Sequence, residues 1–421
     1  MAASPPYHHL QDKRIIVAGA GIGGLAFVVA LHHQWITSSL YSAGKFPSIF
    51  ICDRDPKQVS QEREGYSLSL NGLDINGGLV ALRDIGLLDA ALKCSLLGTD
   101  STNSFRMWDA EWNELLRVTR KPHDGLPTAG IRIRRMDLRN ILIQAAERIT
   151  EIHWGTTCTS AKQLDDGRVQ VMLSNTEGGT IMEECDLLVA ADGAHSKIRA
   201  SVRPEDELNY QGVVQIGGIG QFPEGNLPKP INETWGMAVS GQGVGCFMSP
   251  VDKTSAVWAI SREEPEPRQK PMSEGDKQAA LEEAKEIGQM LKGPFPEMIQ
   301  ATDPSTVFVI PARDKQPFVH DVNGLTRIVF IGDSNHAVSP FAGNGANLAL
   351  KDGWDLAVKL WEHSTVREAV ESYDKLAFPR AITTLKSSHQ RMGIAHATGL
   401  KFQAMRVAFG AGNWLMWLFG V

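Results

Sequence analysis

The N-terminal part of the chain places a strand, a glycine-rich turn and a helix in direct succession. This arrangement constrains the fold more than any other feature. Residues 14–18 are an apolar run typical of a buried strand. The turn that follows has Gly19, Gly21 and Gly24 in a G-x-G-x-x-G pattern, and an apolar run continues to Leu31. Glycines at these positions permit a tight turn, close approach of a pyrophosphate and close helix–strand packing. We therefore expect a parallel sheet with a dinucleotide at its edge.

A second apolar run, at residues 48–52, ends in Asp53 and Arg54. In dinucleotide-binding folds an acidic residue at the end of the second strand accepts hydrogen bonds from ribose hydroxyls. Asp53 follows the last glycine of the turn by 29 residues, against roughly 20 in the usual pattern. We interpret residues 34–47 as a loop insertion that accounts for the difference. Asp55 is an alternative for the ribose role, but Asp53 is preferred because it directly ends the strand.

A second glycine-rich segment, residues 332–347, follows an apolar strand at residues 328–331 and leads into a helix-like run. Its Asp333 stands at the C-terminal edge of the predicted sheet, where ligands of open α/β sheets bind. Pro340 and the nearby glycines let the backbone approach a flat ligand. The helix then starts beneath that ligand with free N–H groups and the positive end of its dipole. This suits a ring that becomes anionic on reduction.

A third strand of the buried type, at residues 186–191, ends in Asp192. Gly193, Ser196 and Arg199 follow at fixed offsets and complete the pattern D-G-x-x-S-x-x-R. With residues 19–24 and 332–347, this is one of three loops that contain glycine and follow an apolar strand. The carboxyl ends of parallel strands share one edge of a sheet, so the three loops are expected to surround one ligand.

Along the chain the motifs are G-x-G-x-x-G at residues 19–24, D-G-x-x-S-x-x-R at residues 192–199 and G-D…P-x-x-G-x-G-x-N at residues 332–347. Together, in this order, they resemble the motifs of the single-component flavoprotein monooxygenases that have the p-hydroxybenzoate hydroxylase fold. The resemblance covers about residues 13–360. The middle region, residues 235–261, is similar to that of the tetracycline-inactivating and fungal secondary-metabolite members. The resemblance implies FAD as cofactor, NAD(P)H as co-substrate with NADPH preferred, and O₂. A flavin C4a-hydroperoxide would hydroxylate or epoxidise an aromatic or polycyclic small molecule.

The resemblance also implies roles for individual residues. Asp333 would accept a hydrogen bond from a ribityl hydroxyl, and Pro340 would border the flavin ring. Asp192 matches a residue linked to the pyrophosphate and the nicotinamide nucleotide, with an interior salt bridge to Arg199 as the alternative. Arg135 matches an R-x-x-L motif whose arginine contacts the cofactor, with Arg132 and Arg134 as alternatives. The predicted cofactor-binding residues are Gly19, Gly21, Gly24, Asp53, Arg54, Gly65, Ser67, Arg135, Asp192, Asp333, Pro340, Gly343, Gly345, Ala346 and Asn347. His336 is expected to be a packed residue.

The substrate-contacting residues are predicted from the middle of the chain, where short apolar runs alternate with Gly/Pro turns. Each candidate is equally well explained as a core residue. The candidates are Gln215, Trp235, Met237, Phe247, Met248 and Trp258. Some relatives carry a catalytic arginine or tyrosine in the substrate sheet, and residues 212–221 offer no counterpart, so no general base is predicted. No Ser-His-Asp order or pair of carboxylates competes for the catalytic role.

We predict an α/β protein with a discontinuous Rossmann-like FAD-binding domain and an inserted antiparallel-sheet substrate domain. The expected FAD-binding segments are 1–85, 127–203 and 318–362, and the substrate segments are 86–126 and 204–317, followed by C-terminal helices in 363–421. Alternation and turn signals predict an antiparallel meander in residues 157–184. A helix capped by Ser273 is predicted within the substrate segments.

Composition narrows the partners. The net charge is −6 and no basic block stands out, so nucleic acid is not expected as a partner. The five cysteines are scattered, which predicts no metal site and fits a reducing, cytoplasmic compartment. The apolar stretch 407–421 is short for a membrane span, which needs ~20 residues. It is predicted to be a helix packed on this chain or on a dimer partner, with peripheral membrane contact as the alternative. The chain is expected to be a monomer or a homodimer.

Two other functions compete with the monooxygenase. A related flavoprotein dehydrogenase or reductase would share all three motifs. A non-catalytic carrier on the same fold would not need the Gly-Asp and Pro-x-x-Gly-x-Gly elements, since these serve the flavin.

Overall fold

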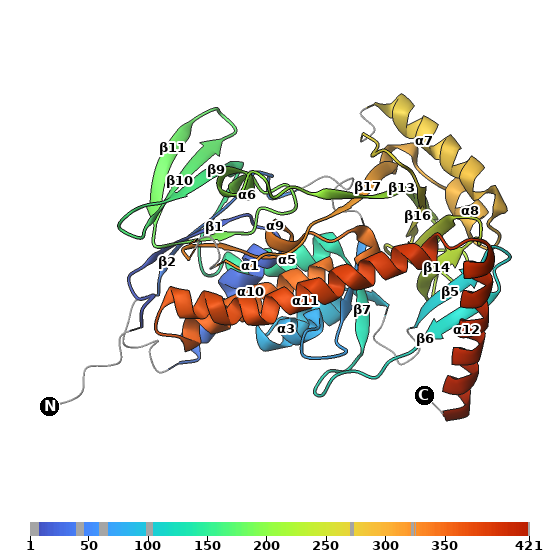
Figure 1. Cartoon of the computed structure of the whole chain (residues 1–421), viewed down its shortest axis with the longest axis horizontal. Coiled ribbons are helices and arrows are strands. Elements are labelled where there is room, and N and C mark those ends of the chain that lie inside the picture. Colours follow the sequence, from blue (N-terminus) through green and yellow to red (C-terminus); the bar gives the residue numbers. More distant parts are fainter. Residues whose placement is uncertain are drawn as a thin grey trace.

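The computed structural model describes residues 8–38, 46–58, 66–97, 104–269, 273–320, 324 and 326–419. Gly65, one of the predicted cofactor residues, lies outside this part of the chain. The described residues form a parallel sheet with helices on one face, and a separate large mixed sheet (Figure 1). A small three-stranded sheet and the long helix α11 (Val366–Ala395) join these two parts.

The parallel sheet has the strand order β18-β12-β1-β2-β8. Every pairing in it is parallel, as the alternation of strands with glycine loops and helices predicts. Its central strands are buried on both faces, which explains their continuous apolar sequences. The strands are β1 (Arg14–Ala18), β2 (Ser48–Asp53), β8 (Ile152–Trp154), β12 (Leu187–Ala190) and β18 (Ile328–Phe330).

Three helices cover one face of this sheet and a meander covers the other. Alternate residues of β1 separate the two cores, because successive side chains of a strand point to opposite faces. Ile15 and Val17 pack against the helices, whereas Ile16 and Ala18 pack against the meander. The helices are α1 (Ile22–Ile36), α5 (Arg135–Ala146) and α10 (Gly345–Glu362); the antiparallel meander is β9 (Thr156–Gln163), β10 (Val169–Asn175) and β11 (Thr180–Cys185). The predicted meander is therefore confirmed.

The seven-stranded sheet has the order β17-β13-β16-β15-β14-β5-β6. Its pairings are antiparallel except that of β14 with β5, which is parallel. Helices α7 and α8 cover one face, and α7 begins with the predicted Ser273 cap, which forms a capping box with Asp276. The elements are β5 (Phe105–Asp109), β6 (Glu114–Val118), β13 (Asn209–Gln221), β14 (Trp235–Val239), β15 (Val244–Pro250), β16 (Ser255–Glu263), β17 (Phe308–Asp314), α7 (Glu274–Ile287) and α8 (Phe295–Gln300).

A three-stranded sheet of order β3-β7-β4 lies next to the N-terminal ends of α5 and α10. Its third strand uses residues 95–97, which the sequence prediction assigned to the substrate segments. Short helices accompany these sheets. The elements are β3 (Ser67–Asn71), β4 (Ser95–Leu97), β7 (Gly130–Arg134), α3 (Gly78–Asp84), α4 (Leu88–Lys93), α6 (Lys197–Val202) and α9 (Asp333–His336).

Two helices end the described chain, as predicted for the C-terminal segment. Helix α11 (Val366–Ala395) is about 45 Å long at 1.5 Å per residue and runs from beside α10 to the seven-stranded sheet (Figure 1). Helix α12 (Gly399–Phe419) lies along β6 at the far end of that sheet. Within the described residues, no helix combines the length and apolar character needed to cross a bilayer.

Candidate cofactor-binding site

The first glycine loop joins β1 to α1 and tolerates no side chain at two of its glycines. A Cβ on Gly19 would lie 2.4 Å from the carbonyl oxygen of Ala191, and Gly19 has a φ of +111°. A Cβ on Gly24 would lie 2.1 Å from the carbonyl oxygen of Gly19. These contacts seat the loop against the end of β12.

Gly21 differs from both, because a Cβ there would meet no atom within 4 Å. It is the N-cap of α1, and no side chain caps that helix. The first backbone bond of α1 runs from the amide of Leu25 to the carbonyl of Gly21. The amides of residues 22–24 thus precede the helical bonding, as in an anion-binding helix start.

Asp53 ends β2, and its carboxylate holds the glycine loop. One oxygen accepts a hydrogen bond from the amide of Ala20 at 2.8 Å, and the other accepts one from the amide of Asp55 at 2.9 Å. The sequence did not predict this bond to the loop. Arg54 has a side chain 53% exposed, beside the carboxylate of Asp55 at 3.8 Å. Asp53 keeps further lone pairs at the edge of the sheet.

Asp192 ends β12 and caps α6. Its Oδ2 accepts hydrogen bonds from the amides of Lys197 at 2.8 Å and Ile198 at 3.2 Å. Its Oδ1 is buried with no hydrogen-bond partner. Burial raises the pKa of this carboxyl group. A buried acceptor without a partner is costly, so this oxygen marks a place for a donor from a ligand.

The alternative predicted for Asp192, an interior salt bridge with Arg199, does not occur. Arg199 donates instead to three backbone carbonyls, those of Ser334 at 2.7 Å, Ala194 at 2.6 Å and Asp206 at 3.0 Å. The hydroxyl of Ser334 also donates to the carbonyl of Ala190 at 2.6 Å. The second and third motifs are therefore bonded to each other at the edge of the parallel sheet.

Asp333 begins α9, directly after the buried strand β18 and Gly332. Its side chain is exposed, yet desolvation by the surrounding protein raises the pKa of its carboxyl group. The charges of His336, Arg135 and Arg199 partly oppose that shift.

Pro340 and the start of α10 lie beside Asp333. Pro340 is exposed and opens the short 3₁₀ turn Pro340–Ala342, after which Gly343 takes a left-handed φ of +57°. A Cβ on Gly345 would have Asp333 Oδ1 only 3.9 Å away and nothing closer than 3.8 Å. Helix α10 has no side-chain cap, and its first backbone bond starts at the amide of Leu348. The amides of residues 345–347, which include Ala346, are left for a ligand.

The side chain of Asn347 has a structural task. Its Oδ1 accepts hydrogen bonds from the amides of Asn71 at 2.8 Å and Gly78 at 3.1 Å, and its Nδ2 donates to the carbonyl of Ser69 at 2.8 Å. It thereby joins α10 to β3 and α3. Only its backbone amide stays available for the contact that the sequence predicted.

Arg135, the first residue of α5, and Ser67 of β3 have different partners in the site. Arg135 donates its backbone amide to the carbonyl of Tyr66 and acts electrostatically on Asp333. Ser67, predicted to lie near the cofactor, instead donates its hydroxyl to the carbonyl of Pro250 at 2.8 Å and accepts a bond from Arg132. The side chain of Ser67 is therefore bound to the seven-stranded sheet.

Four of the six predicted substrate residues lie on one face of the seven-stranded sheet. Met237 packs with Phe341, next to Pro340, and with Met392 of α11. Trp235 and Phe247 lie under the guanidinium group of Arg132. Gln215 lies between Val214 and Ile216, which face the helices, so it points to this same face.

Met248 and Trp258 lie on the opposite face, which corrects the prediction for these two residues. Both are fully buried in the core beneath α7 and α8. The indole N–H of Trp258 donates to Thr302 Oγ1 at 2.8 Å, and its ring packs edge-on against Phe295. Their side chains are part of the core, so we leave them out of the substrate pocket.

A buried ionic network lies beneath the glycine-rich segment 332–347. His336 is 2% exposed and its Nε2 is 2.6 Å from Asp352 Oδ2, which also accepts the amide of Gly332 at 2.8 Å. Arg380 of α11 pairs with Asp352 and Asp355. His336 is thus a packed residue, as the sequence predicted, and Asp352 holds the loop that carries Asp333.

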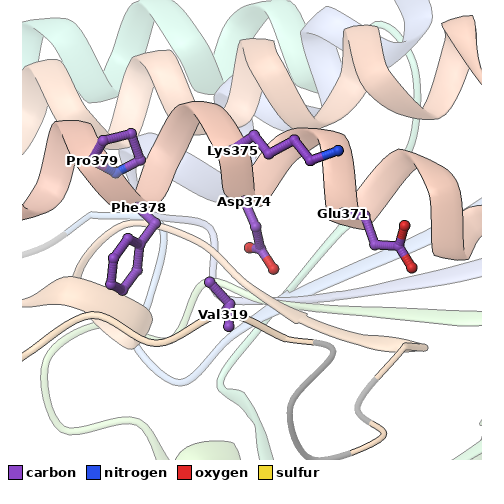
Figure 2. Close-up of a pocket in the computed structure, with 6 residues that line it drawn as sticks. All are labelled: Val319, Glu371, Asp374, Lys375, Phe378 and Pro379. Carbon is purple, nitrogen blue, oxygen red and sulfur yellow. The ribbon is translucent and has the colours of Figure 1, made fainter.

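Other candidate sites are weaker. Within the described residues no cluster of three His, Cys, Asp or Glu side chains could hold a metal ion. An open depression of about 320 Å³ lies on α11 beside Val319. Figure 2 shows Asp374 and Phe378 pointing from α11 toward Val319. Asp374 already binds the ring and amide of His320 at 2.7 Å, so the depression carries no separate chemistry.

The chain is similar to known proteins over most of its length. The family described as FAD binding domain matches residues 81–388. The chain is 42% identical over 416 residues to the monooxygenase cfoF of Aspergillus candidus, covering 97% of each chain. The fold resembles a single-residue variant of Klebsiella pneumoniae HpxO bound to FAD, with a TM-score of 0.73, 20% identity and coverage of 95% and 94%. It also resembles the tetracycline destructase Tet(55), with a TM-score of 0.67, 18% identity and 96% coverage of both chains.

The matched domain covers residues 81–388, and the relative named a monooxygenase shares nearly the full length of this chain. The groups present among the described residues fit FAD: an open glycine at one helix start, a carboxylate oxygen of Asp192 without a hydrogen-bond partner, and Asp333 beside a second uncapped helix. The chain belongs to the family of FAD-dependent monooxygenases.

Proposed function

We propose that this protein is an FAD-dependent, NAD(P)H-consuming monooxygenase that inserts one oxygen atom of O₂ into an aromatic or polycyclic small molecule. The observation that supports it best is the position of Asp333 beside the uncapped N-terminus of α10, with its Oδ1 3.9 Å from a Cβ built on Gly345. A carboxylate and an anion-binding helix start at one place suit the ribityl chain and the pyrimidine edge of a flavin. Hydroxylation and epoxidation both fit this arrangement.

Each loop then has a task. The amides at the start of α1, near Gly21, would bind the pyrophosphate, and Asp53 the ribose, with Arg54 beside the adenosine. Asp192 Oδ1 would accept a hydrogen bond from the cofactor or from the nicotinamide nucleotide. Arg135 would bind next to Asp333. Gly343, Gly345 and the amides of Ala346 and Asn347 would hold the flavin ring behind Pro340.

FAD, when bound, supplies the redox chemistry that activates O₂. The protein's part is to orient the ring, to stabilise its negative charge and to exclude water. The α10 dipole favours negative charge at the pyrimidine edge. Met237, Phe341 and Met392 form an apolar wall beside Pro340, and such a wall keeps water from the reacting atoms.

The substrate is proposed to lie between this wall and Gln215, Trp235 and Phe247. The aromatic rings offer faces for stacking, and the amide of Gln215 can donate to or accept from a ring substituent. One structural neighbour, HpxO of Klebsiella pneumoniae, has been crystallised with FAD and uric acid. A flat polar ring of that kind would fit against the aromatic face that is proposed to bind the substrate.

The test begins with the purified protein, which we expect to be yellow. Candidate aromatic metabolites are then screened for stimulation of NADPH and NADH oxidation under air. Oxygen consumption and product mass are measured together. A product heavier by one oxygen atom, labelled when ¹⁸O₂ is supplied, supports the proposal. A colourless protein rejects the proposal. NAD(P)H oxidation that reduces the substrate without adding oxygen also rejects it, and favours a reductase.

A further inference from the structure

Arg132 of β7 is a buried cation without an acidic partner. It is 3% exposed. Its Nη1 donates to Ser69 Oγ at 2.7 Å, and its Nη2 donates to the carbonyl and the hydroxyl of Ser67. Its Nε is buried with no hydrogen-bond partner. Within the described residues it forms no ion pair.

Two other buried cations, Arg380 and Lys315, have acidic partners. Arg380 pairs with Asp352 and Asp355, and Lys315 pairs with Asp206 at 3.0 Å. Burial lowers the pKa of Arg132 to about 9, and no nearby charge opposes that shift. An uncompensated buried charge is costly, so an arginine retained in this state calls for an anion from outside the chain.

Two aromatic rings flank the guanidinium group. Its central carbon lies 5.1 Å from the ring centre of Trp235 and 5.6 Å from that of Phe247. Both residues belong to the face of the seven-stranded sheet that bears the proposed substrate residues. Arginine stacks readily on aromatic faces and stays charged there, so the rings hold the cation in a fixed orientation.

The position of Arg132 connects it to the cofactor site. Ser69, a partner of Arg132, accepts at its backbone carbonyl a hydrogen bond from Asn347 Nδ2. Asn347 lies in the first turn of α10. The other partner of Arg132, Ser67, bonds to the carbonyl of Pro250 at the end of β15. Arg132 therefore lies where the α10 end of the cofactor site meets the aromatic face of the substrate sheet.

We propose that Arg132 is the anion subsite of the substrate pocket, where it binds the carboxylate or ionised hydroxyl of an aromatic substrate whose ring lies against Trp235 and Phe247. This inference rests on the proposed function and narrows its substrate to acidic aromatic compounds. The anion would take the unpaired Nε–H in a charge-assisted hydrogen bond. An ionised hydroxyl group on the substrate also raises the electron density at the ring carbons that accept the oxygen atom.

The test uses the FAD-loaded enzyme and two probes of nearly equal shape, 2-hydroxybenzoate and its neutral methyl ester. Binding is followed by the change in the visible absorption of the flavin. We expect the wild type to bind the acid more tightly than the ester. In Arg132→Met the affinity for the acid should fall at least tenfold, about the loss of one hydrogen bond to a charged group, while the ester binds as before.

Two further variants separate recognition from structure. Arg132→Lys keeps the charge and should retain preference for the acid, although the planar fork is lost. Arg134→Met lies on the same strand and removes a cation that is paired with Asp137, so it should leave the preference unchanged. If Arg132→Met does not fold, the preference for the acid over the ester in the wild type, Arg132→Lys and Arg134→Met still tests the proposal.

Wild-type enzyme that binds both probes equally, or neither, overturns the proposal, as does equal weakening of both in Arg132→Met. The proposed function fails in a different way. It fails if the wild type lacks FAD or yields no oxygenated product, whereas failure of the anion subsite leaves a yellow, active enzyme that does not distinguish acid from ester.

Discussion

Arg380 of α11 and Asp352 of α10 form an ion pair 2.8 Å long in which the carboxylate is fully buried and the guanidinium side chain is 7% exposed. Asp352 in turn binds the ring of His336 and the amide of Gly332. Because Gly332 directly precedes Asp333, this pair attaches α11 to the loop that carries the proposed ribityl-binding carboxylate.

Removing Arg380 should destabilise the protein severely. Arg380→Met leaves Asp352 without its cation and removes one of the two cations that pair with Asp355. Breaking a buried pair in this way costs about 3–5 kcal/mol. Urea unfolding at neutral pH measures the change. Arg168→Met removes an exposed partner of Asp166 and serves as the control, with no shift of the midpoint expected. Equal midpoints for the two variants would contradict the role given to Arg380.

The same pair predicts a dependence on pH. Burial alone would raise the pKa of Asp352, but the charges of His336 and Arg380 outweigh it, so the pKa lies below its usual 3.8. A lowered pKa contributes stability that is present above 3.8 and is lost as the pH falls further. The stability advantage of wild type over Asp352→Asn should be constant from pH 7 to pH 5 and shrink below about pH 4. An advantage that grows on acidification would show that the carboxylate is not stabilised in the fold.

Two glycines of the first loop should respond differently to alanine. Gly24→Ala places a Cβ 2.1 Å from the carbonyl of Gly19 and should lower the free energy of unfolding by about 1–3 kcal/mol. Gly21→Ala meets no atom within 4 Å, so the apoprotein should unfold almost as the wild type does. Its methyl group would occupy the surface proposed for the pyrophosphate, so FAD affinity should fall. Unfolding and FAD titration of both apoproteins check this, and undiminished FAD affinity in Gly21→Ala would remove the pyrophosphate from this position.

Asp333 should matter for the cofactor and not for the fold. Desolvation raises the pKa of the Asp333 carboxyl group above its usual 3.8, so ionisation of this group opposes folding at neutral pH. The contribution of the protonated group to stability is fully present below pH 3.8 and is lost as the pH rises through the raised pKa. Asp333→Ala should therefore leave the apoprotein at least as stable as wild type. Its FAD affinity should fall at least about tenfold, and it should purify largely colourless. Asp303→Ala, which removes an exposed cap of a 3₁₀ turn, is the control and should keep its colour; full FAD occupancy in Asp333→Ala would refute the assignment.

Much of the fold could be predicted from local sequence. The strands that end in glycine loops are continuous apolar runs, and parallel strands buried on both faces must be so. The left-handed φ of Gly343 and the crowding around Gly19 and Gly24 are backbone requirements that a motif records directly. The capping box at Ser273 is equally local, because its partner lies three residues away.

The side-chain partners could not be predicted in this way. Asp53 binds the amide of Ala20, and Asn347 binds Asn71 and Ser69, across separations of 33 and more than 270 residues. Alternation of apolar residues in β15 and β16 is compatible with either face pointing to the substrate. Only the packing of α7 and α8 shows that Met248 and Trp258 belong to the core.

The sequence alone determined that three strands end in loops able to approach a dinucleotide, because backbone conformation at glycine depends on neighbouring residues. The tertiary structure decided what surrounds each charge. Arg132 is one of three arginines within four residues of sequence, and only packing distinguishes it, by burying it against Trp235 and Phe247 with no acid beside it. Electrostatic cost depends on burial and on partners brought together from distant parts of the chain, so the folded structure is needed to assess it.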